Sequence, residues 1–209
     1  MRKLLIGLAV LAALLVAADF GVKAVAESQA ASALQRSLKL SSKPSVSLGG
    51  FPFLLHLTSG SFGSVGLKDD DFSAEGIRIR RADIDLRDVR FTTGELISGS
   101  GGDIRIAGGE GTAALDGPAL TAALRHQGVS VTVRFSGGRA VLSSGQLPGQ
   151  VAGRLSIRNG ALVFSSSQVS QGFSLDLPTI VPGIHYTGVR IEGAAAVLSF
   201  DVQRQTVHV

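Results

Sequence analysis

The chain of 209 residues contains no cysteine. This absence excludes disulfides, thiolate metal sites and a cysteine nucleophile. It also excludes an anchor of the bacterial lipoprotein type, which needs a cysteine to carry its lipid. Tryptophan is absent too, and the aromatic side chains are ten Phe and one Tyr, so aliphatic residues must build most of the core.

Charged residues are scarce at 17% of the chain, while hydrophobic residues make up 44%. This balance is typical of a folded protein and argues against disorder. Of the formal net charge of +4, residues 1–26 carry +2, from Arg2, Lys3 and Lys23 against Asp19. The rest of the chain shows neither the clustered basic face nor the stacking aromatics of a nucleic-acid-binding protein. We therefore expect no nucleic-acid partner.

One long apolar run, from Leu4 to Ala18, follows the two basic residues at the N-terminus. A basic flank, an apolar run of this length and small residues after it are typical of an export signal. Ala24-Val25-Ala26 offers a cleavage site, and Val16-Ala17-Ala18 offers a second one. Retention as an uncleaved signal anchor is the competing interpretation, and both place the remaining chain outside the cytoplasm. We predict a signal peptide or signal anchor over residues 1–26.

From residue 45 onward the dominant hydrophobic period is two, which is typical of strands with one buried face. The clearest example is Ile77–Leu86, where aliphatic residues alternate with arginines and aspartates. Val89 continues on the other parity, which predicts a bulge or bend near Arg87 and Asp88. Asn159-Gly160 separates two further alternating runs and predicts a hairpin turn, because both residues tolerate a positive φ.

Helical signals are few. Gly117-Pro118 predicts a helix start, with an apolar stripe at Leu120 and Leu124. A short helix is expected over Phe53–Leu57, and the helix that follows the signal is expected to run to about residue 40. The expected fold class is α+β, with a long antiparallel sheet whose apolar face is covered by a few helices, in a single domain over residues 27–209.

No motif in the chain predicts catalysis or a metal site. The four histidines lack metal-ligand spacing, and no G-x-S-x-G sequence surrounds a serine. Gly109-x-Gly111 superficially resembles a dinucleotide loop, but Asp116-Gly117-Pro118 would break the helix that such a loop requires, so a glycine-rich bend between strands is expected. Asp69-Asp70-Asp71 lacks the glycine and distal glutamate of a calcium loop and is expected to form a solvated turn. We therefore expect no cofactor, no metal and no enzymatic activity.

The segment from Gly49 to Gly60 concentrates two of the ten Phe together with three Leu, shortly after the predicted N-terminal helix. Such apolar density is compatible with three structural roles. It can belong to the core, it can form the lip of a lipid-binding cavity, or it can be a wedge that contacts a membrane.

Four motifs together resemble the LmeA-like phospholipid-binding domain of actinobacterial envelope proteins. The most specific are Gly-Phe-Pro-Phe-Leu at Gly50–Leu54 and Ser-Gly-Ser-Phe-Gly-Ser-Val at Ser59–Val65. The others are the alternating strand at Ala82–Val89 and Gly111-Thr112 followed by a Leu-bearing helix. The resemblance covers most of the chain to about Phe135 and is looser beyond it.

The resemblance implies an exported protein that binds phospholipid and supports envelope maintenance. It implies a fold like that of the tubular, BPI-like lipid-binding proteins, in which a long curved antiparallel sheet wraps around one or two helices. An aliphatic sheet face suits this function, because burial of apolar surface contributes about 25 cal/mol per Å². The expected partners are an anionic phospholipid and a membrane surface, with no protein partner identified.

Two sets of side chains are candidates for lipid contact. The headgroup candidates are Arg78, Arg80 and Arg81. The residues expected to line the groove or its membrane lip are Phe51, Pro52, Phe53, Leu54, Leu57, Phe62, Ile77, Ile79, Ile84, Leu86, Leu120 and Leu124.

Two other functions stay open at this stage. The main alternative is a structural or scaffolding partner of an envelope glycolipid-synthesising enzyme, whose apolar face is filled by its own side chains. The other is a lipid hydrolase, for which the sequence carries no motif.

Overall fold

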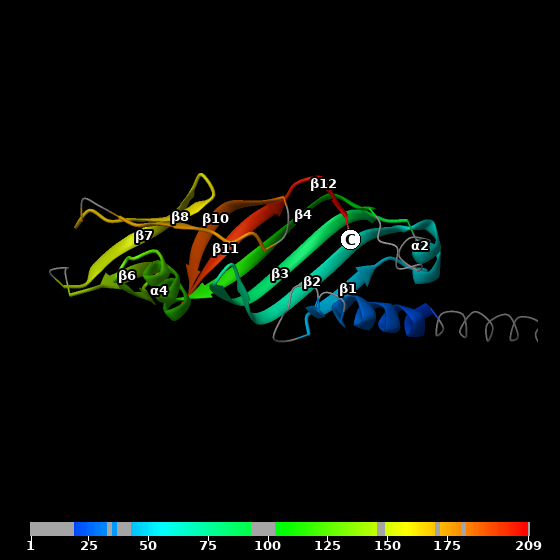
Figure 1. The fold of residues 1–209 in the computed structure, drawn as a ribbon, viewed down its shortest axis with the longest axis horizontal. Coiled ribbons are helices and arrows are strands. Elements are labelled where there is room, and N and C mark those ends of the chain that lie inside the picture. Colours follow the sequence, from blue (N-terminus) through cyan, green and yellow to red (C-terminus); the bar gives the residue numbers. More distant parts are fainter. Residues whose placement is uncertain are drawn as a thin grey trace, which may run out of the picture.

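The computed structural model describes residues 19–32, 35–36, 43–92, 103–145, 149–169, 172–180 and 183–208. These residues form two antiparallel sheets, which follow one another along an elongated molecule (Figure 1). The expected α+β class with a curved antiparallel sheet is confirmed. The predicted signal over residues 1–26 lies mostly outside the described residues, which include only its last part.

The large sheet contains three long strands and four shorter ones. Their bounds are β1 (Ser45–Gly49), β2 (Ser61–Ala74), β3 (Ile77–Arg90), β4 (Asp103–Asp116), β10 (Ile184–Glu192), β11 (Ala195–Val202) and β12 (Gln205–His208). The order across the sheet is β1-β2-β3-β4-β11-β10, and β12 pairs with the first half of β4. The alternation predicted for β3 is confirmed, because its aliphatic side chains from Ile77 to Leu86 are all 7% exposed or less.

Two aspartates with positive φ interrupt the alternation of the long strands. Asp71 in β2 has φ 63° and Asp88 in β3 has φ 47°. The buried positions of β3 change parity beside them, from Leu86 to Val89 at the second site. The irregularity predicted near Asp88 is therefore present, but it is a left-handed residue within continuous pairing and not an inserted residue, since the β2–β3 register is the same on both sides.

The expectation of a turn at Asp69-Asp70-Asp71 was wrong. These aspartates lie within β2, and the turn falls at Glu75 and Gly76, both with positive φ. Aspartate has a low strand propensity, but here the facing strand supplies cations. Arg81 Nε lies 3.0 Å from Asp70 Oδ1, and Arg78 Nη2 lies 2.6 Å from Asp71 Oδ2.

The expectation of a glycine-rich bend at Gly109-x-Gly111 was also wrong. Both glycines lie inside β4, between β3 and β11. A Cβ atom on Gly111 would lie 2.5 Å from the ring of Phe200 and 2.7 Å from the carbonyl oxygen of Asp83. Glycine is needed here because the Phe200 side chain of β11 packs across the backbone of β4.

The small sheet is a meander of five strands in sequence order. Its strands are β5 (Thr132–Ser136), β6 (Arg139–Ser143), β7 (Val151–Arg158), β8 (Ala161–Ser165) and β9 (Ser174–Asp176). The hairpin turn predicted at Asn159-Gly160 is confirmed between β7 and β8, where both residues have positive φ, 51° and 78°.

Helix α4 (Gly117–His126) connects the two sheets, and the predicted start at Gly117-Pro118 is confirmed. Asp116 caps it, since its Oδ1 accepts the backbone N–H of Ala119 at 2.8 Å. Thr121 donates to the carbonyl of Gly117 at 2.8 Å and accepts the N–H of Val133 at 2.9 Å, which ties α4 to β5. Leu120 and Leu124 are fully buried, so the helix is held by its predicted apolar stripe.

Two other helices lie at the far end of the large sheet. Residues 19–32 are helical and run beside β1, and α2 (Phe53–Ser59) follows β1 (Figure 1). The short helix expected over Phe53–Leu57 is thus confirmed. One continuous buried cluster includes residues of both sheets and Ala31 of the N-terminal helix. Among the described residues, no helix is both long enough and apolar enough to cross a membrane.

Candidate functional site

The structure divides the twelve apolar site residues predicted from the sequence into two groups. The exposed ones are Phe51, Pro52 and Leu54, and Leu57 is half-buried. The buried ones are Phe53, Phe62, Ile77, Ile79, Ile84, Leu86, Leu120 and Leu124. The buried group extends from α2 through β3 to α4, so these residues form the core of the molecule and do not meet at one surface site.

The large apolar side chains that are exposed in the described part of the chain lie on two neighbouring segments. Phe20, Val22 and Val25 belong to the helix of residues 19–32, and Phe51, Leu54 and Leu55 belong to the start of α2 and the residue pair before it. Phe51 and Leu55 are 61% and 64% exposed. We call these six residues the apolar end. Contiguous exposed apolar patches are typical of sites that contact a membrane or a partner.

A buried carboxylate holds the two segments of the apolar end together. Asp19 is 4% exposed, and its two carboxylate oxygens accept the backbone N–H groups of Phe53 and Leu54, each at 2.8 Å. These are the unpaired N–H groups of the first turn of α2, whose own N-cap residue, Pro52, makes no side-chain cap. The rings of Phe20 and Phe51 stack beside this cap, with centroids 6.3 Å apart.

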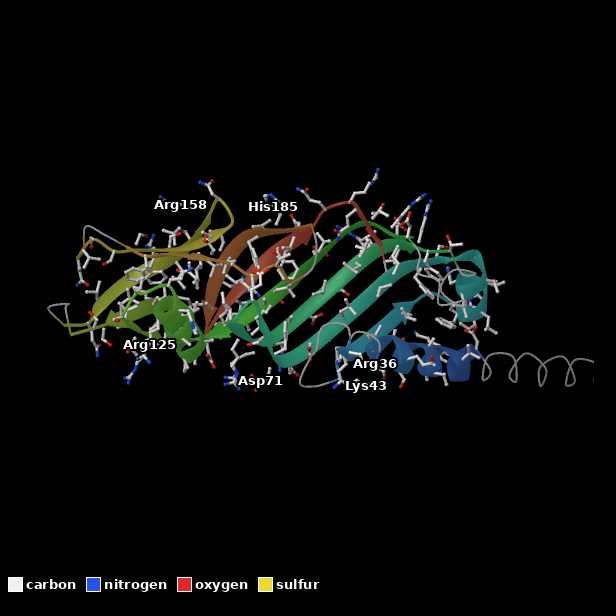
Figure 2. The ribbon with its side chains drawn as sticks, in the orientation of Figure 1. Arg36, Lys43, Asp71, Arg125, Arg158 and His185 are labelled. Atoms are coloured by element: carbon white, nitrogen blue, oxygen red, sulfur yellow. The ribbon has the colours of Figure 1, made fainter. Side chains whose placement is uncertain are left out.

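The same helix covers the edge strand of the large sheet. Glu27 Oε1 accepts the backbone N–H of Leu48 in β1 at 2.8 Å, and Lys23 Nζ lies 3.7 Å from the same oxygen. Lys43, which lies beside the helix in Figure 2, donates to Ser28 Oγ at 2.9 Å. An open sheet edge invites pairing with another chain, and this helix restricts that edge. The sequence-based interpretation missed these roles because it assigned Asp19 and Lys23 to the flank of a signal.

Stacked aromatic rings pack between α2 and the large sheet. Phe53 stacks on Phe62, and Phe62 stacks on Phe91, with centroids 5.5 Å apart in both pairs. The ring of His56 lies 6.4 Å from that of Phe62, and its Nδ1 is 3.2 Å from the carbonyl oxygen of Ser61. These contacts fix α2 on the large sheet, with its exposed side chains on the outer side.

The three predicted headgroup arginines lie on the exposed face of β3, each close to a carboxylate of the protein. Arg78 and Arg81 pair with Asp71 and Asp70, as described above, and Arg80 Nε lies 3.9 Å from Asp116 Oδ2. The hydrogen bond from Arg78 holds the pKa of Asp71 below its ordinary value. The positive charge of all three arginines is thus partly offset within the protein.

Three other arginines lie on the large sheet close to α2, and we call Arg87, Arg90 and Arg105 the basic collar. All three are exposed, and Arg90 and Arg105 face each other across β3 and β4. Arg90 pairs with Ser61, the residue after the C-cap of α2. No ion pair joins these arginines to a carboxylate within the described ranges. The sequence-based interpretation missed them because strand pairing, and not sequence proximity, brings them together.

Among the described residues, no group of three or more His, Asp or Glu side chains is placed to hold a metal ion. Tyr186 is buried, and burial raises the pKa of its hydroxyl, which donates to the carbonyl of Pro178 at 2.7 Å. This tyrosine therefore has a packing role between β10 and the segment after β9.

Comparison with protein families gives one match, to a family model described as LmeA-like phospholipid-binding, over residues 17–201. The match extends well past Phe135, where the resemblance noted in the sequence became looser. Searches of curated proteins and of solved structures gave no match.

Proposed function

Because the chain belongs to the LmeA-like phospholipid-binding family, we propose that it is an exported, non-catalytic envelope protein that contacts phospholipid through its apolar end. The observation that carries this proposal is the gathering of the exposed large apolar side chains, including Phe20, Phe51 and Leu55, at one end of an elongated molecule. A large aromatic side chain buries on the order of 150–250 Å². Transfer of that surface into lipid, at about 25 cal/mol per Å², supplies the binding free energy.

The position of the N-terminus supports a membrane as the lipid source. The apolar run from Leu4 to Ala18 directly precedes Asp19, which joins the two segments of the apolar end. A signal peptide or anchor in that run would bring the same end of the molecule to the outer face of the inner membrane. The proposed location is therefore the periplasmic side of an actinobacterial envelope.

The basic collar supports a preference for anionic phospholipid. Arg87, Arg90 and Arg105 lie on β3 and β4, where Arg90 pairs with Ser61, which follows α2. Each arginine close to an anionic bilayer contributes about 1 kcal/mol. In this proposal the basic collar binds the headgroup. Arg78, Arg80 and Arg81 do not, because each of them lies close to a carboxylate of the protein.

A groove for acyl chains, as in the tubular lipid-binding folds, is the further part of the proposal. The curved large sheet presents a continuous aliphatic face, and an acyl chain would lie against it. That face is nevertheless covered by other parts of the protein, since Ile79 of β3 and Leu120 and Leu124 of α4 are all fully buried. That packing favours the second candidate function, a scaffolding partner of an envelope glycolipid-synthesising enzyme without a lipid cavity of its own.

Sedimentation with liposomes tests the membrane contact, using the chain from Asp19 onward so that the apolar run cannot carry binding. We expect the unaltered protein to sediment with anionic vesicles and the Phe51→Asp/Leu55→Asp variant to lose at least tenfold in affinity. Ser73→Asp/Ser174→Asp, which adds the same charge at exposed strand positions elsewhere, should bind normally. Equal binding by the two variants would reject the apolar end as the contact surface.

Native mass spectrometry of the full chain, purified from its own envelope, separates the groove from the scaffold. A co-purified phospholipid supports the groove, and a lipid-free protein that retains a protein partner supports the scaffold.

A further inference from the structure

The small sheet differs from the large one in its charge. On the large sheet, outside the basic collar, Lys68, Arg78, Arg80, Arg81 and Arg190 each lie within 4.0 Å of a carboxylate. Residues 129–180, which contain the small sheet, include four arginines and a single acidic residue, Asp176. This part of the protein is therefore an unbalanced cationic surface.

Two of these arginines face each other on neighbouring strands. Ala140 of β6 pairs with Gly153 of β7, so Arg139 and Arg154, which adjoin that pair, occupy facing positions. Both are exposed. Like charges in facing positions destabilise a sheet, and no ion pair joins either arginine to a carboxylate in the part of the chain that the structure describes. An anion between them would reverse that repulsion.

Serine hydroxyls extend the row on both sides. Arg139 pairs with Ser136 of β5, and Arg154 pairs with Ser165 of β8. The row therefore reads serine, arginine, arginine, serine across four strands. Adjacent strands lie about 4.8 Å apart, so the two arginines and Ser165, which occupy three neighbouring strands and line one hollow, are close enough to contact a single small tetrahedral anion.

A hollow of about 350 Å³ lies at this row, lined by both arginines, Ala152, Gly153 and the three serines at positions 165–167. Its rim is held in place, because Ser166 Oγ donates to the carbonyl of Ala152 at 2.7 Å and Gln168 Oε1 accepts the N–H of Ala152 at 3.2 Å. Gly153 contributes only its backbone to the hollow. A Cβ atom on it would point to the buried face of the sheet and lie 2.3 Å from the ring of Phe164, so that position must remain glycine.

We propose that this hollow is a binding site for a phosphate group, carried by a lipid headgroup or free in solution. The planar guanidinium group binds phosphate oxygens with two parallel hydrogen bonds, and the hydroxyls of Ser165 and Ser167 can donate to the oxygens that remain, while that of Ser166 donates to Ala152. No carboxylate lines the hollow to oppose an anion. The site lies on the small sheet, at the end of the molecule away from α2 (Figure 1), so it does not depend on the proposed membrane contact.

Isothermal titration of the full chain in a non-ionic detergent tests the proposal, with inorganic phosphate and with dihexanoyl phosphatidic acid as probes. The Arg139→Gln/Arg154→Gln variant should bind both probes at least tenfold more weakly than the unaltered protein. Arg158→Gln removes an exposed arginine that projects from the β7–β8 turn of the same sheet (Figure 2), outside the hollow, and should bind normally. Arg139→Lys/Arg154→Lys, which keeps the charge and loses the paired hydrogen bonds, should be intermediate.

The two probes distinguish the sources of the phosphate. Phosphatidic acid binding at least tenfold tighter than inorganic phosphate, with the same dependence on the arginines, would identify a lipid headgroup. Equal affinities would identify a free phosphate group. Failure of the unaltered protein to bind either probe, or equal binding by the double glutamine variant with its circular dichroism unchanged, would overturn the proposal.

Discussion

Asp19 accepts the backbone N–H of Phe53 at 2.8 Å, across 34 positions of the sequence, in a buried environment. This contact joins the first described helix to the first turn of α2. It makes residues 19–26 part of the folded protein, although the sequence pattern assigned them to an export signal.

Replacement of Asp19 by alanine should lower the free energy of unfolding by about 1–3 kcal/mol, because two buried N–H groups lose their acceptor. Urea denaturation measures the change. Asp19→Asn keeps one acceptor oxygen, and its free energy of unfolding should lie between those of the unaltered protein and Asp19→Ala. Asp201→Ala, which removes an exposed carboxylate from β11, should have a stability within about 0.5 kcal/mol of the unaltered protein. An alanine variant as stable as that control would show that the cap contributes nothing.

The position of Asp19 also predicts where the mature chain begins. Cleavage after Ala18 would keep the cap of α2, and retention of the signal as an anchor would keep it too. Cleavage after Ala26 would remove Asp19, Phe20 and Lys23 together. We therefore expect mass spectrometry of the protein from its envelope to give an N-terminus at or before Asp19, and a mature chain beginning at Glu27 would contradict the prediction.

Gly111 should not tolerate a side chain. Gly111→Ala places a methyl group 2.5 Å from the ring of Phe200, and overpacking of this kind costs about 1–3 kcal/mol. Gly63→Ala in β2 is the matched control, since a Cβ atom there meets nothing within 4 Å. Thermal unfolding of the two variants checks the expectation, which fails if both unfold at the same temperature.

The Asp71–Arg78 pair predicts a specific pH dependence. Since the pKa of Asp71 is lowered by the hydrogen bond from Arg78, the pair stabilises the fold above the ordinary aspartate pKa. That contribution is lost as the pH falls through the lowered value. An NMR titration of the Asp71 carboxyl should show its midpoint rise in Arg78→Gln and stay nearly unchanged in Arg90→Gln. A midpoint unaffected by Arg78→Gln would rule out the pair in solution.

The features predicted correctly from the sequence depend on local signals. Asn159-Gly160 defines its hairpin turn through its own backbone preferences, and Gly117-Pro118 starts α4 for the same reason. The alternation of β3 is equally local, because one strand face is buried along most of its length. In each case neighbouring residues carry the whole signal.

The features predicted wrongly depend on partners far along the chain. Gly111 is a strand residue because Phe200, on β11, packs over it. Asp70 and Asp71 lie in a strand because arginines of β3 face them. The residues around Gly111 and Asp70 do not by themselves predict these pairings. They were therefore interpreted as bends and turns, which was incorrect.

The candidate site was predicted in part. The apolar density around Phe51 and Leu54 was recognised, but Phe53, two residues from Phe51, is fully buried while Phe51 is 61% exposed. Which side chains point outward depends on how α2 is held, and Asp19 holds it. The basic collar was missed for a similar reason, since Arg90 and Arg105 meet only through the pairing of β3 with β4.

Strand β4 pairs on one side with β3, which is synthesised just before it, and on the other side with β11 and β12, which are synthesised far later. Until residues 195–208 have left the ribosome, the backbone groups along that side of β4 lack their partner strands. Contacts between distant parts of a chain slow folding, and bare strand edges recruit other molecules. A nascent chain halted before β11 would therefore be the species most prone to aggregate, because its three long strands are complete while one edge of β4 is unpaired.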